Sequence, residues 1–309
     1  RDIYGNTCLL FASKKGNIPL IKWLLDNGSS YSETTKYGNS CIGIAAFNGN
    51  LETVKWFLQN GYPIDENENK KTCISQACKG GHLELVKWLS NNGFSLKDTL
   101  PPAIFGGNIE LVEWLLQNGC DLNQRLYRQS PAIFSAVEGG NIKMIEWLIN
   151  KGHSIKEIYD KNSCMTIACS WGHLELIKWL VGKGCDIEDK DKNGNSCVML
   201  AVQNKRLDVV KWLIENGCSL TEKSKRNETC MTLASATGNM DIIKLLFENG
   251  CSLDEMNQQG TCVMIAATNK HLDAVLWMLS NGSSLDENQS SSIFWKKSCR
   301  DILKDNNMF

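Results

Sequence analysis

Tryptophan recurs at a nearly constant interval along this 309-residue chain, and this regularity limits the possible folds more than any other feature. The series consists of Trp23, Trp56, Trp88, Trp114, Trp147, Trp179, Trp212 and Trp277, with Leu245 in the one vacant place. A second series, usually preceded by asparagine, follows it in step: Gly28, Gly61, Gly93, Gly119, Gly152, Gly184, Gly217, Gly250 and Gly282. Because a fixed period of about 20 to 50 residues is typical of stacked repeats, we expect a series of similar units rather than the pair of globular domains that length alone suggests.

The segment from Ser196 to Gly217 shows what one unit contains. Ser196 is expected to cap a helix by accepting a hydrogen bond from a free backbone N–H, and Cys197–Val202 is the short apolar helix that follows. Leu207–Ile214 is apolar on one face and predicts a second, amphipathic helix. Gly217 is expected to end that helix in the left-handed conformation. The polar residues Asp191–Asn195 predict a turn between units.

Two segments, Gly81–Leu89 and Gly172–Leu180, share Gly-His-Leu followed by a helix that ends in Trp-Leu. With this pattern the units resemble ankyrin repeats, whose other signature is Thr-Pro-Leu-His. The chain keeps that proline only in Ser130-Pro131 and otherwise has cysteine there: Thr7-Cys8, Ser40-Cys41, Thr72-Cys73, Ser163-Cys164, Ser196-Cys197, Thr229-Cys230 and Thr261-Cys262. The resemblance implies an all-α solenoid of stacked helix-turn-helix units with hairpin loops, formed by residues 1–309 as a single array.

The fourth repeat, residues 94–119, is shorter than the others. It has Pro101-Pro102 where the first helix is expected, and proline inside a helix costs about 3 kcal/mol. We therefore expect this repeat to lack a hairpin and to have a shortened first helix, which would bend or weaken the stack. At the ends, we expect a closing cap over residues 283–309 and further repeats or domains before Arg1, because an uncapped end exposes an apolar face.

The chain has 14 cysteines, and their positions repeat with the units. Most follow the capping Ser or Thr or the closing glycine. Equivalent positions in neighbouring repeats are about 8–10 Å apart, whereas a disulfide needs Cα atoms within about 6.8 Å. We therefore interpret the cysteines as small buried apolar residues. So many free thiols indicate a reducing compartment, the cytoplasm or alternatively the nucleus.

The sequence contains no arrangement typical of an enzyme. Its four histidines include His82, His173 and His271, which share one turn position and are expected to bond to backbone. The motifs of zinc proteases, serine hydrolases and P-loop proteins do not occur. We therefore expect no catalytic residue, no cofactor and no metal site.

Charge and hydropathy narrow the choice of partner. Lys and Arg number 33 against 34 Asp and Glu, which gives a formal net charge of -1. A balanced chain has no general attraction for nucleic acid. No apolar stretch approaches the roughly 20 residues that a membrane helix needs. We therefore expect a protein partner, with no nucleic acid and no membrane.

In the ankyrin family, hairpin tips and the concave face of the first helices bind proteins. The two positions before the Gly-His turn, or its equivalent in each repeat, are mostly small, polar or charged here, as in Lys14-Lys15, but Phe47 and Trp171 depart from that rule. Exposed Trp, Tyr and Arg are favoured at protein interfaces. The candidate protein-binding residues are Tyr4, Lys14, Lys15, Tyr37, Phe47, Tyr127, Arg128, Tyr159 and Trp171.

Alternatives remain at this stage. Phe47 and Trp171 can instead pack locally over their own repeat. The chain can be a structural spacer or a self-associating assembly subunit rather than a scaffold for another protein. The resemblance also raises hydroxylation of Asn123, since some ankyrin arrays are modified on an Asn in such a setting. The sequence does not identify the partner, because fold does not fix function.

Overall fold

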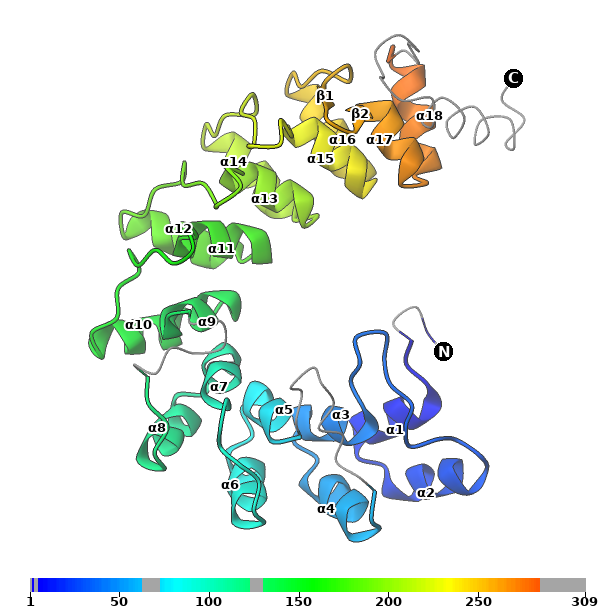
Figure 1. Cartoon of the computed structure of the whole chain (residues 1–309), viewed down its shortest axis with the longest axis vertical. Helices are drawn as coiled ribbons and strands as arrows, with labels where there is room; N and C mark the ends of the chain where they lie inside the picture. Colours follow the sequence, from blue (N-terminus) through cyan, green and yellow to red (C-terminus); the bar gives the residue numbers. More distant parts are fainter. Residues whose placement is uncertain (1, 3–4, 63–72, 123–129, 284–309) are drawn as a thin grey trace. The chain divides into compact units, whose positions relative to one another are not determined.

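The computed structural model describes residues 2, 5–62, 73–122 and 130–283, and these form paired helices joined by turns (Figure 1). The first helices of the pairs are α1 (Cys8–Lys15), α3 (Cys41–Phe47), α5 (Cys73–Gly80), α7 (Leu100–Gly106), α9 (Ala132–Glu138), α11 (Cys164–Trp171), α13 (Cys197–Gln203), α15 (Cys230–Thr237) and α17 (Cys262–Thr268). The second helices are α2 (Ile18–Asp26), α4 (Leu51–Gln59), α6 (Leu83–Asn91), α8 (Ile109–Gln117), α10 (Ile142–Asn150), α12 (Leu174–Gly182), α14 (Leu207–Glu215), α16 (Met240–Glu248) and α18 (Leu272–Ser280). The predicted all-α repeat fold is confirmed.

Hairpin loops between the pairs contribute the little β-structure that is described. The strands β1 (Met256–Asn257) and β2 (Gly260–Thr261) pair antiparallel. Single bridges join Thr34 to Ser40 and Lys190 to Ser196 in the same way. These hairpins precede first helices, as the polar turn residues predicted.

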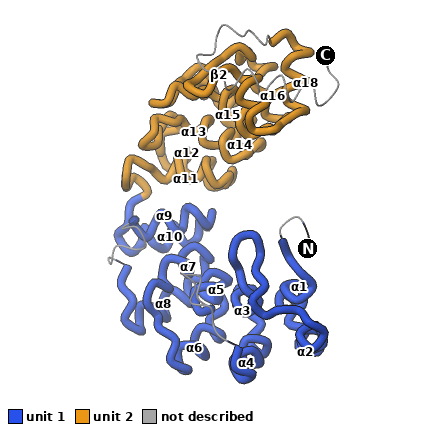
Figure 2. The backbone as a smooth tube through the Cα atoms, turned by 45° about the vertical axis from the view of Figure 1, so that its right-hand side comes forward, with its two compact units in different colours: residues 1–154 blue, residues 155–309 orange. Residues whose placement is uncertain are grey.

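The chain divides into two compact units, residues 1–154 and 155–309 (Figure 2). In unit 1, the first helices pack in sequence order from α1 to α9, and each also packs on its own second helix. In unit 2, the same arrangement runs from α11 to α17. Because each helix pair packs on its neighbours in sequence, stability in each unit arises mainly between adjacent repeats.

The core lies between successive pairs, which explains the burial pattern of the helices. In α13, every residue from Cys197 to Val202 is buried, because neighbours cover the helix on both sides. In α14, burial is limited to Val209, Val210 and Leu213. The second helices are therefore amphipathic, with an exposed outer face.

The closing glycines end the second helices as predicted. Gly217 has a φ of 83°, in the left-handed region that L-residues avoid. A methyl group there would meet no atom within 4 Å, so backbone conformation rather than crowding requires glycine. The preceding Asn216 donates from its Nδ2 to the carbonyl of Trp212 at 2.8 Å. This explains the Asn-Gly pair, since the amide satisfies a carbonyl that the ending helix leaves open.

The predicted cap at Ser196 is wrong, and Thr261 before α17 also makes no side-chain capping bond, but other Ser and Thr residues in this place do. Side chains that accept the capping hydrogen bond are Thr7, Ser40, Ser163 and Thr229. The Oγ of Ser196 is buried and has no partner among the described residues. At Ser163, the hydroxyl of Thr166 accepts from the cap's own N–H and fixes the cap. Met199 holds the equivalent place after Ser196 and cannot make this bond.

The fourth repeat lacks its hairpin, as predicted, but its first helix is not shortened. Residues 92–99 lead directly from α6 into α7, and α7 has 7 residues, as many as α3 or α13. Pro101 and Pro102 lie in the first turn of the helix. The backbone N–H groups of a first helical turn have no acceptor within the helix. Proline, which lacks an N–H, is therefore tolerated there. The helix packs on both α5 and α9.

Several predicted features lie outside the described residues. These are Tyr4, Asn123, Tyr127, Arg128 and, apart from Ser283, the C-terminal cap over 283–309. Within the described part of the chain, no helix combines the length and the apolar character needed to cross a bilayer.

Candidate functional site

The last turns of the first helices form a row in each unit, which we call the C-terminal row. In unit 1 it consists of Lys14, Phe47, Lys79, Phe105 and Glu138, each three residues before the residue at the N-cap of the second helix of its pair. In unit 2 the equivalent residues are Ser170, Gln203, Ala236 and Thr268. The row is where the candidate residues Lys14 and Phe47 come together.

Side chains from the following repeat tie the row together through its backbone. Asn50 donates from Nδ2 to the carbonyls of Ser13 and Lys14, both at 3.0 Å. His82 Nε2 lies 2.9 Å from the carbonyl of Phe47, and His271 Nε2 lies 3.1 Å from that of Ala236. These bonds satisfy carbonyls that a helix end leaves open. The prediction that His82 and His271 bond to backbone is confirmed.

Glycines next to the row bring three pairs of first helices into close approach. A methyl group on Gly80 would lie 2.2 Å from the carbonyl oxygen of Phe47. The same group on Gly106 or Gly139 would lie 2.4 Å or 2.1 Å from the carbonyl oxygens of Lys79 and Phe105. No residue with a Cβ atom fits these places unless the backbone moves. Because glycine has no side chain, these three positions leave the neighbouring residues of the row uncovered on that side.

The predicted lysines and aromatic residues are exposed in unit 1. Lys14 and Lys15 lie on the surface, and Phe47 is 43% exposed. Tyr37 is 59% exposed at the hairpin tip, where Lys36 Nζ lies 5.1 Å from its ring centroid. An exposed aromatic ring that its own fold does not need is typical of a protein interface.

In unit 2, the two described candidates belong to one repeat. Tyr159 is half-buried and pairs through its backbone with Asn162. Trp171 is 40% exposed, and its ring stacks on that of His173, with centroids 6.5 Å apart and planes within 7°. Trp171 therefore combines local packing with an exposed face.

Sequence reasoning missed two aromatic residues of this surface, Phe11 and Phe105. Phe11 is 44% exposed and lies one helical turn before Lys14. Phe105 has Lys79 Nζ 4.3 Å from its ring centroid. Phe105-Gly106 occupies the same two positions as Phe47-Asn48. Phe105 was missed because the first helix of the fourth repeat was expected to be shortened, so its residues were not aligned with those of the other repeats.

The tryptophan series packs between repeats. Lys22 Nζ lies 5.6 Å from the Trp56 ring centroid of the next repeat, and Trp147 Nε1 donates to Glu113 of the preceding repeat at 3.2 Å. Phe247 and Trp277 meet edge to face across adjacent repeats. These rings join neighbouring second helices and are half-buried, whereas Trp23 in the first described repeat is 60% exposed.

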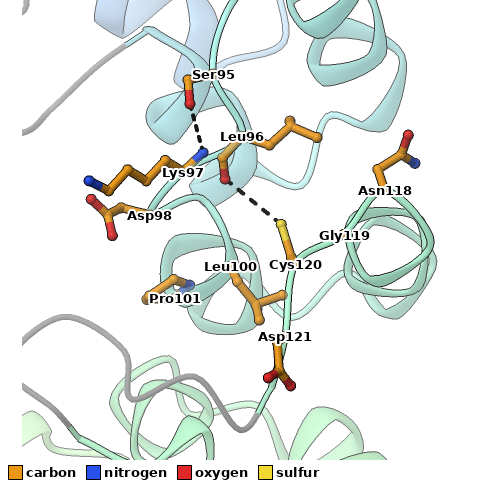
Figure 3. Close-up of a pocket in the computed structure, with 10 residues that line it drawn as sticks. All are labelled: Ser95, Leu96, Lys97, Asp98, Leu100, Pro101, Asn118, Gly119, Cys120 and Asp121. Atoms are coloured by element: carbon orange, nitrogen blue, oxygen red, sulfur yellow. Dashed lines mark hydrogen bonds between the residues drawn. The ribbon is translucent and has the colours of Figure 1, made fainter.

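A pocket of about 330 Å³ opens where the fourth repeat lacks its hairpin (Figure 3). Its lining consists of Ser95, Leu96, Lys97, Asp98, Leu100, Pro101, Asn118, Gly119, Cys120 and Asp121. The Sγ of Cys120 lies 3.8 Å from the carbonyl of Leu96, its only partner drawn in Figure 3. The two carboxylates and one lysine in the lining do not converge on a common point in Figure 3.

The cysteines are packing residues, as predicted. All but three of those described are buried, the exceptions being Cys8, Cys120 and Cys185. Burial raises the pKa of the Cys73 thiol from 9.0 to about 12, because the thiolate would lose its hydration. Such thiols are poor nucleophiles. Among the described residues, no group of three or more His, Cys, Asp or Glu side chains is placed to hold a metal ion.

Comparison with known proteins agrees with this architecture. A family model described as ankyrin repeats (3 copies) matches residues 9–99, 42–126, 100–191, 133–224 and 198–289. No curated protein matches the chain.

Proposed function

The chain belongs to the ankyrin-repeat family, and from that premise we propose that it is a non-enzymatic scaffold that binds a protein partner. Ankyrin repeats are in general protein-interaction modules. The proposed binding surface consists of the hairpin tips and the concave first-helix face, with residues 1–309 acting as one array. The supporting observation is the set of exposed aromatic and basic side chains there, above all Phe47 at 43% exposure.

The exposure of Phe47 has no structural purpose that its repeat requires. The equivalent places in unit 2 hold Ser170, Gln203, Ala236 and Thr268, and those repeats fold in the same way. A phenyl ring left in water gains free energy when a partner covers it, by about 25 cal/mol per Å² of apolar surface. The position therefore favours binding over packing.

The location proposed for this scaffold is a reducing compartment, the cytoplasm or the nucleus. The described cysteines are free thiols, and disulfides are rare in such compartments.

The test is partner capture by the whole chain from a lysate of its source. The double variant Phe47→Ala/Trp171→Ala should lose captured proteins while its circular dichroism stays unchanged. Ile149→Ala/Val181→Ala is the matched control, since these residues are 36% and 38% exposed on second helices. Equal capture by the two variants would contradict this surface.

Sedimentation without added partner separates scaffold from self-assembling subunit. We expect the sedimentation coefficient of the purified chain to be independent of concentration. A rise with concentration that Phe47→Ala/Trp171→Ala abolishes would instead assign the surface to contacts between copies of the chain.

A further inference from the structure

We propose that the first-helix face of unit 1 binds a protein segment in which acidic and apolar residues are interleaved. This inference rests on the proposed scaffold function and specifies its partner. The face consists of Phe11, Lys14, Lys15, Phe47, Lys79 and Phe105. We refer to these six residues as the Lys–Phe face.

The six residues lie on one surface because of helix periodicity and repeat stacking. Phe11, Lys14 and Lys15 are three and four residues apart, so they share one side of α1. Phe47, Lys79 and Phe105 occupy the same place in α3, α5 and α7, which pack in that order. The Asn50 and His82 hydrogen bonds and the three glycine contacts described above fix the spacing of their backbones.

Lysine and phenylalanine alternate over the first four places of the row, from Lys14 to Phe105, and the lysine of α5 lies over the ring of α7. Lys79 Nζ is 4.3 Å from the Phe105 centroid, a distance at which cation and ring attract each other. Phe11 and Phe47 are 44% and 43% exposed. A partner must therefore offer carboxylates to the ammonium groups and apolar side chains to the rings.

The charge of this face differs from that of its counterpart in unit 2. The first helices of unit 1 carry Lys14, Lys15 and Lys79 against one acid, Glu138 in α9. The helices α11, α13, α15 and α17 carry no charged residue. The whole chain is nearly neutral at -1, whereas the first helices of unit 1 have three lysines against one glutamate and so a positive balance. Charge complementarity then selects an acidic partner.

The same features favour a protein segment over nucleic acid. The face has three lysines and no arginine, fewer cations than a typical nucleic-acid footprint. Equivalent places in neighbouring repeats are about 9 Å apart. Four repeats therefore span about 27 Å, which an extended segment covers with about eight residues at 3.3 Å each.

The experiment uses the whole chain and a fluorescein-labelled twelve-residue peptide of alternating Glu-Glu and Leu-Leu pairs. Fluorescence anisotropy at low salt should show saturable binding with a Kd below about 100 μM, weakened by added salt. A peptide with Ser in place of Leu, and another with Lys in place of Glu, should each bind at least about tenfold more weakly. Equal binding of either control peptide would overturn the proposal.

Variants of the chain locate the site. Lys14→Glu/Lys79→Glu should weaken peptide binding by about tenfold or more, whereas Gln203→Glu/Asn204→Glu, the matched change in unit 2, should leave it within about twofold. Lys14→Gln/Lys15→Gln/Lys79→Gln is the second variant if charge reversal prevents folding. Unchanged binding by the folded variants would refute the site.

Two further outcomes separate this inference from the proposed function. Tighter binding of a labelled oligothymidylate than of the Glu–Leu peptide would overturn the acidic partner and assign the face to nucleic acid. If the peptide does not bind but Phe47→Ala/Trp171→Ala still loses captured proteins, the partner chemistry is wrong and the scaffold function stands. If capture is also unchanged, both fail.

Discussion

The Nε2 of His82 lies 2.9 Å from the carbonyl oxygen of Phe47. A side chain of the third repeat therefore caps the C-terminal end of α3, the first helix of the second repeat. A carbonyl can only accept, so Nε2 is the donor. Asn50 makes the equivalent bond in the preceding pair of repeats, with its Nδ2 3.0 Å from the carbonyl of Lys14. Adjacent repeats are therefore joined by polar bonds at the helix end that presents the candidate site.

We expect His82→Ala to lower the free energy of unfolding by about 1 kcal/mol, because the carbonyl of Phe47 loses its partner. His82→Asn should recover most of that loss, since asparagine makes the bond at position 50. Urea unfolding followed by circular dichroism measures both. Equal stability of the two variants would show that this bond does not contribute.

Glycine at the end of α9 is required by close backbone approach. Gly139→Ala places a methyl group 2.1 Å from the carbonyl oxygen of Phe105, so we expect a loss of about 2 kcal/mol or more as α7 and α9 separate. Gly182→Ala is the matched control, because Gly182 is also helical and has no atom within 4 Å of the added carbon. That change should raise stability by about 0.5–1 kcal/mol. Thermal unfolding of both variants decides the comparison.

The two serines that precede α11 and α13 should respond differently to the same substitution. Ser163→Ala removes a hydroxyl that accepts from the backbone N–H of Thr166 and should cost about 1 kcal/mol. Ser196→Ala removes a buried hydroxyl without a partner among the described residues, so the change should be neutral or slightly stabilising. Denaturant midpoints measured side by side test this. A larger loss at Ser196 would contradict the structural assignment.

Stability should fall as the pH rises above about 9. Burial raises the pKa of the thiols of Cys41, Cys73 and Cys164 from 9.0 to about 12. Between these values the folded chain keeps its protons and the unfolded chain releases them, so rising pH favours unfolding. Their contribution is fully present below pH 9 and is lost as the pH approaches 12.

The measurement is the free energy of unfolding in urea from pH 8 to pH 11. Each such thiol steepens the decline by up to about 1.4 kcal/mol per pH unit. Cys73→Ala, with no thiol to ionise, should therefore show a shallower decline than the unchanged chain, whatever its stability at neutral pH. Parallel declines would show that Cys73 ionises equally in both states.

The repeat and its two helices follow from the amino-acid sequence alone. The apolar stripe that includes each tryptophan specifies an amphipathic helix, and the Asn-Gly pair specifies where that helix ends. Both signals depend on neighbouring residues and need no distant contacts. The burial of most cysteines was also predictable, because they recur at fixed places of the repeat, most of them at the start of the apolar first helices. The length of α7 was not, because whether Pro101 breaks a helix depends on which turn it enters.

Which side chains meet across repeats is decided by tertiary packing. Gly80, Gly106 and Gly139 look unremarkable in the sequence. Their requirement for glycine appears only in the stack, where an added methyl group would lie 2.1–2.4 Å from a carbonyl oxygen of the preceding repeat. The same stacking aligns Lys79 with Phe105, 26 residues apart, into one face. Sequence spacing fixes the period of a repeat, but packing between repeats fixes the surface, because contacts between separate helices depend on their approach in space.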